Sequence, residues 1–449
     1  MTERPTSYGG PPRGRVTALR GATVSLRDDP FQAPSAACLE HYDDALIVIE
    51  DGRITAFGAY ATTRRALPAG VEPRRFENAL ITPGFVDAHV HYPQTQIIGA
   101  FGSDLLGWLE RYTFPTELLF ADRAHAEQVA ALFLRALFAA GTTTAAVYGT
   151  VHAHSADAFF AEAERFGARM IAGKVMMDRN APEGLLDTAE RGYEESRALI
   201  ERWHGRGRLG YAVTPRFAPA CSDAQLDAAG ALLAENPGVR LQTHLAESAA
   251  EVAWVKELFP ARADYLDVYA HHGLAGPRSL FGHAIHLDED AFARCHACDA
   301  ALVHCPGSNL FLGSGLFRLF DAVDPRRPVR VGLGSDVGAG TSLSPFRSMG
   351  DACKVSAVVG RRLAAAQAFH LATLGGARAL GVEDRIGRIA VGYEADLCVL
   401  DLAATPLLAF RARWCDSVEE LLFALMTLAD DRLVRATYVA GEAVFDRDG

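Results

Sequence analysis

Between residue 81 and about residue 336, short apolar runs rich in β-branched residues alternate with Ala- and Leu-rich stretches that have helical periodicity. The runs expected as strands are residues 81–91, 142–148, 168–176, 209–214, 240–246, 280–286, 301–304 and 329–334. The helical stretches include 124–140, 158–166, 185–204, 224–236 and 248–258. Eight strand–helix units predict an α/β fold of the (β/α)8 barrel type, in which functional side chains gather where the strands end.

The two flanks of the chain have a different pattern. Short alternating strands are expected at residues 16–26 and 46–58, the second interrupted by a hairpin-type turn, and again at 387–401 and 436–445. Neither flank has enough apolar side chains for a core of its own, so we expect both to form one small β-sandwich. The expected domains are a disordered Pro- and Gly-rich leader (1–14), the β-sandwich (15–79 plus 386–449) and the catalytic barrel (80–385).

Composition excludes several classes of protein. The 449 residues are 49% hydrophobic and 22% charged, which is ordinary for a globular protein, and the net charge of −11 without a basic block argues against nucleic-acid binding. No apolar run reaches the about 18 residues of a membrane-spanning helix. The eight cysteines lack a disulfide-framework spacing and the N-terminus lacks a signal-peptide core, so we expect a cytoplasmic protein.

Two histidines lie at the end of the first expected barrel strand, in the segment PGFVDAHVH (83–91). Residues i and i+2 of a strand point to the same face, so His89 and His91 can share a metal ion. A His-x-His pair by itself is equally consistent with two solvated histidines. However, His244, His283 and Asp336 lie at the ends of the fifth, sixth and eighth strands. Three or more imidazoles and a carboxylate at one rim suit a divalent metal of zinc type.

The sequence favours one metal per subunit, zinc or alternatively iron, with the ligands His89, His91, His244 and Asp336. Lys174 lies on the third expected strand, whereas a carboxylated lysine that bridges two metals would lie on the fourth. A bound divalent ion lowers the pKa of water from about 15.7 towards about 7. We expect the catalytic residues Glu247 and Asp336 to move protons, and His283 to hydrogen-bond the water or the substrate, or to lie close enough to ligate.

The remaining histidines have simpler interpretations. His286 faces the other side of its strand from His283 and is interpreted as structural, and His152 and His154 are interpreted as loop or surface residues. His304 can face the site, but no metal role is needed for it.

The rim residues and both flanks resemble the amidohydrolase superfamily over nearly all of the chain after the leader. Several segments are similar more specifically to the guanine deaminases of that superfamily, namely 105–117, 173–182, 214–219 and 309–315. One departure is Gly307, where a Thr or Ser is expected before Ser308. The resemblance implies hydrolysis of guanine to xanthine and ammonia, a step of purine catabolism, by a homodimer.

That reaction agrees with the residues at the rim. A flat purine needs donors and acceptors in one plane beside an apolar wall, and Gln94, Arg216 and Phe217 offer an amide, a guanidinium and a ring face. The expected substrate-binding residues are Gln94, Arg216, Phe217, His244, Glu247 and Asp336. In the expected mechanism, metal-bound hydroxide attacks the amino-bearing carbon, Glu247 and Asp336 carry protons, and His283 steadies the developing charge.

Two alternatives remain open. One is another deaminase or a chlorohydrolase of the superfamily that acts on a different nitrogen heterocycle. The other is a metal-free scaffold protein that kept the barrel and lost its chemistry, although such a protein would be expected to lose ligand histidines.

Overall fold

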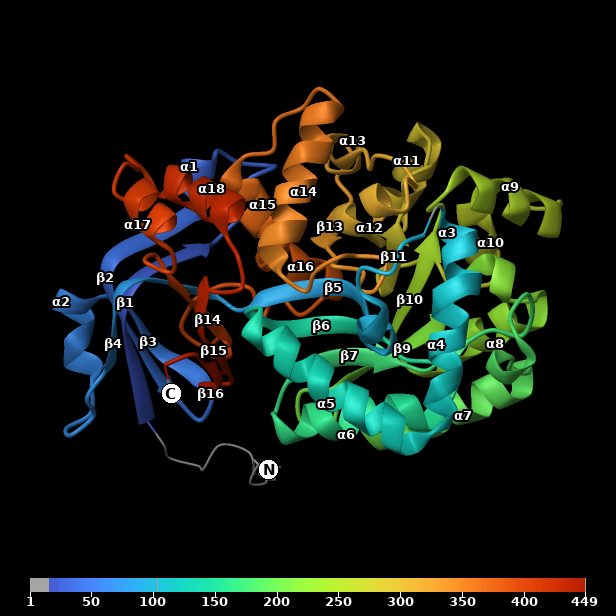
Figure 1. Ribbon diagram of the computed structural model, residues 1–449, viewed down its shortest axis with the longest axis horizontal. Helices are drawn as coiled ribbons and strands as arrows, with labels where there is room; N and C mark the ends of the chain where they lie inside the picture. Colours follow the sequence, from blue (N-terminus) through green and yellow to red (C-terminus); the bar gives the residue numbers. More distant parts are fainter. Residues whose placement is uncertain (1–15, 103, 449) are drawn as a thin grey trace.

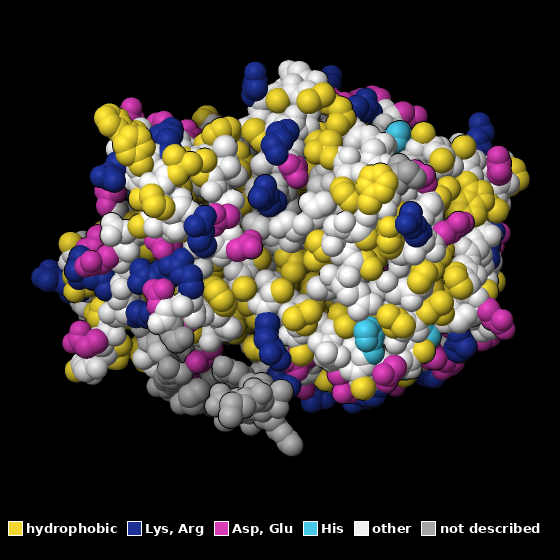
Figure 2. Space-filling model, viewed as in Figure 1, with side chains coloured by type: hydrophobic (Ala, Val, Ile, Leu, Met, Phe, Trp, Pro, Cys, Tyr) yellow, Lys and Arg dark blue, Asp and Glu magenta, His cyan; other side chains and the backbone are white. Residues whose placement is uncertain are grey.

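The computed structural model describes residues 16–102 and 104–448, and the leader expected at residues 1–14 lies outside the described residues. Figure 1 shows a large part built of strands and surrounding helices, with a smaller sheet beside it that contains both ends of the described chain. No helix in the described ranges is long and apolar enough to cross a membrane. Basic and acidic side chains are interspersed among apolar ones over the face seen in Figure 2.

The larger part is the expected barrel. Within the described residues, eight strands are joined in the order β13-β12-β11-β10-β9-β7-β6-β5, and neighbouring strands are parallel. Their bounds are β5 (Phe85–His91), β6 (Thr142–Tyr148), β7 (Arg169–Gly173), β9 (Gly210–Pro215), β10 (Arg240–Leu245), β11 (Ser279–His283), β12 (Ala301–His304) and β13 (Arg330–Leu333). The short β8 (Val175–Met176) pairs with β9. The barrel predicted from the alternating pattern is therefore confirmed.

Helices connect the strands and lie along the outside of the barrel (Figure 1). The longer ones are α5 (Arg123–Ala139), α6 (Ala153–Arg165), α7 (Ala189–Trp203), α8 (Asp223–Glu235), α9 (Ala249–Leu258), α10 (Tyr265–His271), α11 (Glu289–Ala297), α14 (Pro345–Val358), α15 (Ala365–Leu371) and α16 (Leu374–Leu380). Their starts follow from the sequence, because Asp122, Ser222 and Ser248 each accept a hydrogen bond from a backbone N–H of the first turn. In α5, Val129, Phe133 and Leu137 recur at helical spacing and are all buried.

The other α-helices of the described residues are α1 (Ser35–Cys38), α2 (Tyr60–Thr63), α3 (Leu105–Trp108), α4 (Phe114–Leu118), α12 (Pro306–Phe311), α13 (Leu319–Ala322), α17 (Pro406–Ala412) and α18 (Val418–Leu428). A π-helical turn at Leu109–Thr113 joins α3 to α4.

The prediction of a single strand over residues 81–91 is wrong, because this stretch contributes to two strands. β4 (Arg74–Pro83) belongs to the small sheet, and β5 begins the barrel at Phe85. Gly84 joins them, and a Cβ at this position would lie 2.2 Å from Thr143 Oγ1. Both halves are buried, so the apolar run continues through the break and periodicity cannot reveal it.

The small sheet contains strands from both ends of the chain. Among the described residues its order is β16-β15-β14-β4-β1-β2-β3. The bounds are β1 (Val16–Leu26), β2 (Leu39–Glu50), β3 (Arg53–Ala59), β14 (Leu397–Asp401), β15 (Val434–Val439) and β16 (Glu442–Asp446). β4 pairs with β1 on one side and β14 on the other, so the flanks form one small domain as expected. Its strands are hydrogen-bonded in one continuous mixed sheet, and the exact domain boundaries remain a prediction.

Two expected strands of the flanks are shorter or divided. Of residues 387–401 only the last five form β14, since Gly387 and Gly392 adopt φ of 91° and 88°, which a strand does not allow. Residues 46–58 belong to β2 and β3, joined by the expected turn at Asp51 and Gly52.

The barrel closes between β5 and the segment after β13. Asp336 donates a backbone hydrogen bond to the His89 carbonyl, and His91 donates one to the Val337 carbonyl, both at 2.9 Å. Asp87 supports the same seam, because its carboxylate accepts hydrogen bonds from Ser335 N at 3.0 Å and Ser335 Oγ at 2.5 Å. The backbone that closes the barrel therefore places Asp336 beside the His-x-His pair.

Candidate active site

The strand-end histidines and Asp336 converge as the sequence indicates. His91 Nε2 lies 3.3 Å from His89 Nε2 and 3.2 Å from His244 Nε2. Asp336 Oδ1 lies 3.3 Å from both His89 Nε2 and His91 Nε2. The structure thus brings all four residues expected as metal ligands to one point.

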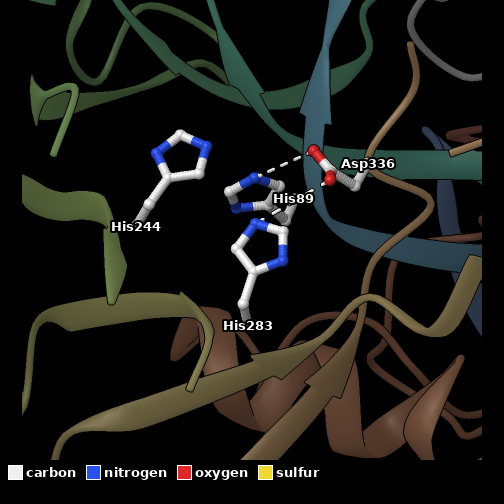
Figure 3. A group of neighbouring side chains, drawn as sticks. All are labelled: His89, His244, His283 and Asp336. Carbon is white, nitrogen blue, oxygen red and sulfur yellow. Dashed lines mark ion pairs between the residues drawn. The ribbon is translucent and has the colours of Figure 1, made fainter. Parts of the chain in front are cut away.

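His283 lies in the same cluster. Ligand atoms of His89, His244, His283 and Asp336 all fall within 4.8 Å of one another. In Figure 3 ion-pair lines join Asp336 to both His89 and His283, and His283 Nε2 is 3.8 Å from Asp336 Oδ2. His283 Nε2 is also 3.5 Å from Glu247 Oε2, and its Nδ1 lies 2.9 Å from Asn309 Oδ1. His283 therefore lies next to both carboxylates expected to move protons.

Two glycines leave the space that His89 occupies. A Cβ at Gly282, on β11, would lie 2.7 Å from His89 Cε1, and one at Gly334 would lie 2.9 Å from His89 Cβ. Both distances are shorter than real contacts, so these positions must lack a side chain for the imidazole to reach the cluster.

The donor set and its spacing fit a divalent metal. His244 Nδ1 lies 2.6 Å from the Arg216 carbonyl, which can only accept, so this nitrogen carries the proton and Nε2 offers a lone pair. Nε2 of His91 lies 3.2–3.3 Å from Nε2 of His244 and of His89, so neutral imidazoles here can turn these nitrogens to one cation. Ligand atoms about 2.0–2.1 Å from a tetrahedral metal are about 3.3 Å apart. The four spacings given above among His89, His91, His244 and Asp336, at 3.2–3.3 Å, match that value.

The pKa values of the two carboxyl groups in the site are shifted in opposite directions. Burial, with the nearby charge of Asp336, raises the pKa of Glu247 well above its ordinary range. Burial opposes ionisation of Asp336 as well, but His283, His89 and His91 outweigh it and hold its pKa well below the ordinary range. Burial lowers the pKa of His91 to about 3, which keeps the imidazole neutral as metal binding requires.

A cavity of about 400 Å³ opens onto this cluster. All six residues expected to bind substrate line it, namely Gln94, Arg216, Phe217, His244, Glu247 and Asp336. Its apolar wall is formed by Leu105, Trp108, Leu109 and Ala339. A flat heterocycle therefore has both an apolar face and directed polar groups available in one cavity.

Sequence reasoning gave no role to Glu117, although it lies in one of the segments that indicated the family. It is fully buried on α4, and both its carboxylate oxygens accept hydrogen bonds from Arg216 Nη1, at 2.9 and 2.8 Å. Tyr148 was also missed, and its ring lies 4.4 Å from the ring of His91. The available signal for Glu117 was an acidic residue in the stretch 114–121, where all other residues except Thr116 are apolar.

The remaining candidates lie outside the cluster. His154 and His286 bond the carbonyls of Phe120 and Ser314, at 2.7 and 2.9 Å. His304 stacks on Phe317 with ring centroids 4.8 Å apart. Lys174 Nζ donates to Asp187 at 2.5 Å and to Glu195 at 2.7 Å, so two carboxylates already hold it.

Comparison with known proteins identifies the class to which this fold and site belong. The model of the amidohydrolase family matches residues 80–444. The chain belongs to the amidohydrolase family. It is 46% identical to guanine deaminase of Escherichia coli (strain K12) over 436 residues, which cover 96% of this chain and 98% of the relative. It is 41% identical over 437 residues to a probable guanine deaminase of Deinococcus radiodurans, with the shares 96% and 98%.

Solved structures agree with these relatives. The E. coli guanine deaminase structure has a TM-score of 0.93 at 45% identity and covers 96% of this chain and 100% of that one. A guanine deaminase of C. acetobutylicum, described with guanine bound in its active site, has a TM-score of 0.86 at 27% identity, with coverage of 96% and 100%. An adenosine deaminase of Xanthomonas campestris with bound zinc has a TM-score of 0.80 at 26% identity, with coverage of 96% and 93%. The family resemblance indicated by the sequence is confirmed.

Proposed function

We propose that this protein catalyses the hydrolytic deamination of guanine to xanthine and ammonia. The observation that carries the proposal is one cavity in which Gln94 and Arg216 meet Glu247 and Asp336 beside a cluster of imidazoles. The relatives named guanine deaminase, 46% and 41% identical over nearly the whole chain, support it.

His89, His91, His244 and Asp336 would hold one divalent metal per subunit, and we propose zinc, with iron as the alternative. When bound, such an ion lowers the pKa of a water towards about 7, which makes a nucleophile available at neutral pH. The zinc in the related adenosine deaminase supports the choice.

The chain's own residues then bind the base. Arg216 donates hydrogen bonds to the carbonyl oxygen at the six position of the purine, and Gln94 offers both a donor and an acceptor in its amide. Phe217 contributes a ring face. Adenine carries an amino group at the six position and would leave the N–H groups of Arg216 that face the base without an acceptor, so we expect the site to reject it.

Two carboxyl groups move the protons. Asp336 accepts one proton of the attacking water and delivers it to the departing amino group, which leaves as ammonia. Glu247 accepts the other and delivers it to the ring nitrogen beside the reacting carbon. The two water protons and the oxygen are thereby all accounted for in xanthine and ammonia. His283 Nε2, 3.5 Å from Glu247, stabilises the charge that develops during attack.

Ammonia release from a panel of guanine, adenine, cytosine and a triazine tests the proposal. Guanine is expected to be the substrate hydrolysed fastest, with xanthine as its product. The alternative, a family member acting on another heterocycle, has the related adenosine deaminase in its favour. Faster release from adenine, cytosine or the triazine would establish that alternative.

We also propose a cytoplasmic homodimer. The eight cysteines, which all lie in the described residues, are unpaired, as is usual for proteins of a reducing compartment. The dimer rests on the family resemblance, and light scattering coupled to size exclusion would contradict it by giving the mass of a single 48.2 kDa chain.

A further inference from the structure

Glu117 holds two of the polar groups that the proposed function assigns to the substrate. Its carboxylate accepts hydrogen bonds from Arg216 Nη1 at 2.9 and 2.8 Å, and a third from Gln94 Nε2 at 3.2 Å. Gln94 Oε1 accepts in turn from Gly338 N at 3.2 Å. Gln94 and Arg216 line the cavity and Glu117 does not, so Glu117 contacts these two side chains on the side that faces away from the cavity.

The ion pair between Glu117 and Arg216 compensates two buried charges. Arg216 is 2% exposed and Glu117 fully buried, and a buried guanidinium without a carboxylate partner is strongly destabilised. Among the described residues, Glu117 is the one carboxylate within ion-pair distance of Arg216. The pair carries no net charge, so it offers directed N–H donors to a neutral base without placing a free cation in the cavity.

The geometry also fixes which donors are left for a ligand. Both bonds to Glu117 come from Nη1, and no hydrogen bond among the described residues uses Nε or Nη2 of Arg216. For Gln94, the carboxylate on one side and the Gly338 N–H on the other determine which end of the amide is nitrogen and which is oxygen. Without the carboxylate, the Gly338 N–H alone would hold the amide, and Nε2 would lose the acceptor that fixes its position.

Glu117 further connects the cavity wall to the barrel. The wall residues Leu105, Trp108 and Leu109 precede it on the same segment, which continues through the π-helical turn into α4. Arg216 follows β9, so the ion pair joins this segment to the barrel rim.

We propose that Glu117 is a positioning residue that sets the preference of the cavity for a heterocycle with a carbonyl oxygen facing Arg216. It acts through Arg216 and Gln94, and the inference rests on the proposed function. Replacing it should therefore impair recognition of guanine more than the chemistry that follows.

The test is a double-mutant cycle on guanine hydrolysis with Glu117→Gln and Arg216→Ala. Glu117→Gln alone should lower kcat/KM on the order of 10- to 100-fold, mainly through KM, with metal content unchanged, since hydrogen bonds to charged groups contribute in this range. Added to Arg216→Ala, it should lower kcat/KM by a much smaller factor than it does alone, because Arg216 makes two of the three hydrogen bonds to Glu117 and only the one from Gln94 remains. If the two substitutions lower kcat/KM by independent factors that multiply in the double variant, or if Glu117→Gln lowers only kcat, the assignment is overturned.

Glu394→Gln is the matched control. Glu394 is also a buried carboxylate that binds two arginines, Arg169 and Arg208, but it lies outside the cavity lining. The substitution Glu394→Gln should lower the stability of the fold and leave the KM for guanine unchanged. If the unaltered protein releases no ammonia from guanine, the proposed function fails. If that protein is active and the losses multiply, only the role of Glu117 fails.

Discussion

The Nε2 atoms of His91 and His244 face each other at 3.2 Å, although 153 positions separate the two residues in sequence. His244 Nδ1 is committed to the Arg216 carbonyl at 2.6 Å, so the nitrogen that faces His91 carries a lone pair. Asp336 adds an anionic oxygen 3.3 Å from His91 Nε2. A divalent cation between these atoms would be bound by all three residues, and we therefore expect the proposed chemistry to depend on a metal.

Removal of the metal should abolish turnover and lower the melting temperature. A ligand that binds only the folded state stabilises it by mass action, so we expect chelation to lower Tm by about 5 °C or more. Adding zinc or iron should restore both properties, and their relative effect identifies the better metal. Full activity in protein shown to be metal-free would contradict the proposed site.

Glu247→Gln should retain the metal and lower kcat by about 10²- to 10⁴-fold, because the amide cannot carry a proton between water and the ring nitrogen. Glu257→Gln, an exposed position on α9, is the control and should leave kcat unchanged. Metal analysis and steady-state kinetics measure the outcome. Normal turnover by Glu247→Gln would remove this residue from the mechanism.

Arg216→Ala should weaken guanine binding while leaving the metal content intact. The substitution removes donors for the carbonyl oxygen and leaves Glu117 buried without its cation, so KM should rise by at least about tenfold. Kinetics with guanine and metal analysis of the same preparation separate the two effects. An unchanged KM would show that Arg216 does not contact the base.

Gly282→Ala should displace the imidazole of His89, because the added Cβ would lie 2.7 Å from His89 Cε1. We expect less than half the metal content of the unaltered protein, and a parallel loss of activity. Gly276→Ala is the matched control, since a Cβ there meets nothing within 4 Å. Full metal occupancy in Gly282→Ala would mean that His89 tolerates the shift or is not a ligand.

Glu394→Ala should lower the free energy of unfolding by about 3–5 kcal/mol, since it leaves Arg169 buried without its carboxylate and leaves Arg208 with Asp396 alone. Burial opposes ionisation of Glu394, but Arg169 and Arg208 outweigh it and lower its pKa below the ordinary value of 4.5. A lowered pKa in the folded state means that this stabilisation is complete at pH 7 and is lost as pH falls through that pKa.

Denaturation of both proteins at pH 7 and at about pH 3 checks this expectation. The difference between them should shrink on acidification. A difference that is the same at both pH values would mean that the ionised form of Glu394 contributes nothing.

Much of the barrel could be predicted because its signals are local. β6 and β12 have the bounds expected from their apolar runs, and α5 and α8 differ from expectation by one residue at each end. The break at Gly84 could not be predicted, because burial on both sides of it removes the alternation that distinguishes one sheet from another. The helices α17 and α18 were also not anticipated.

The sequence by itself determined which residue types end the barrel strands, and hence that His89, His91, His244, His283 and Asp336 could share a site. Strand periodicity and the order of strand–helix units are local properties, so they can be read from a single chain. Only the tertiary structure decided that Glu117 lies behind Arg216 and Gln94, and that Asp336 is bound to the backbone of His89. Those contacts depend on how distant loops pack and on how the barrel closes, which no local pattern encodes.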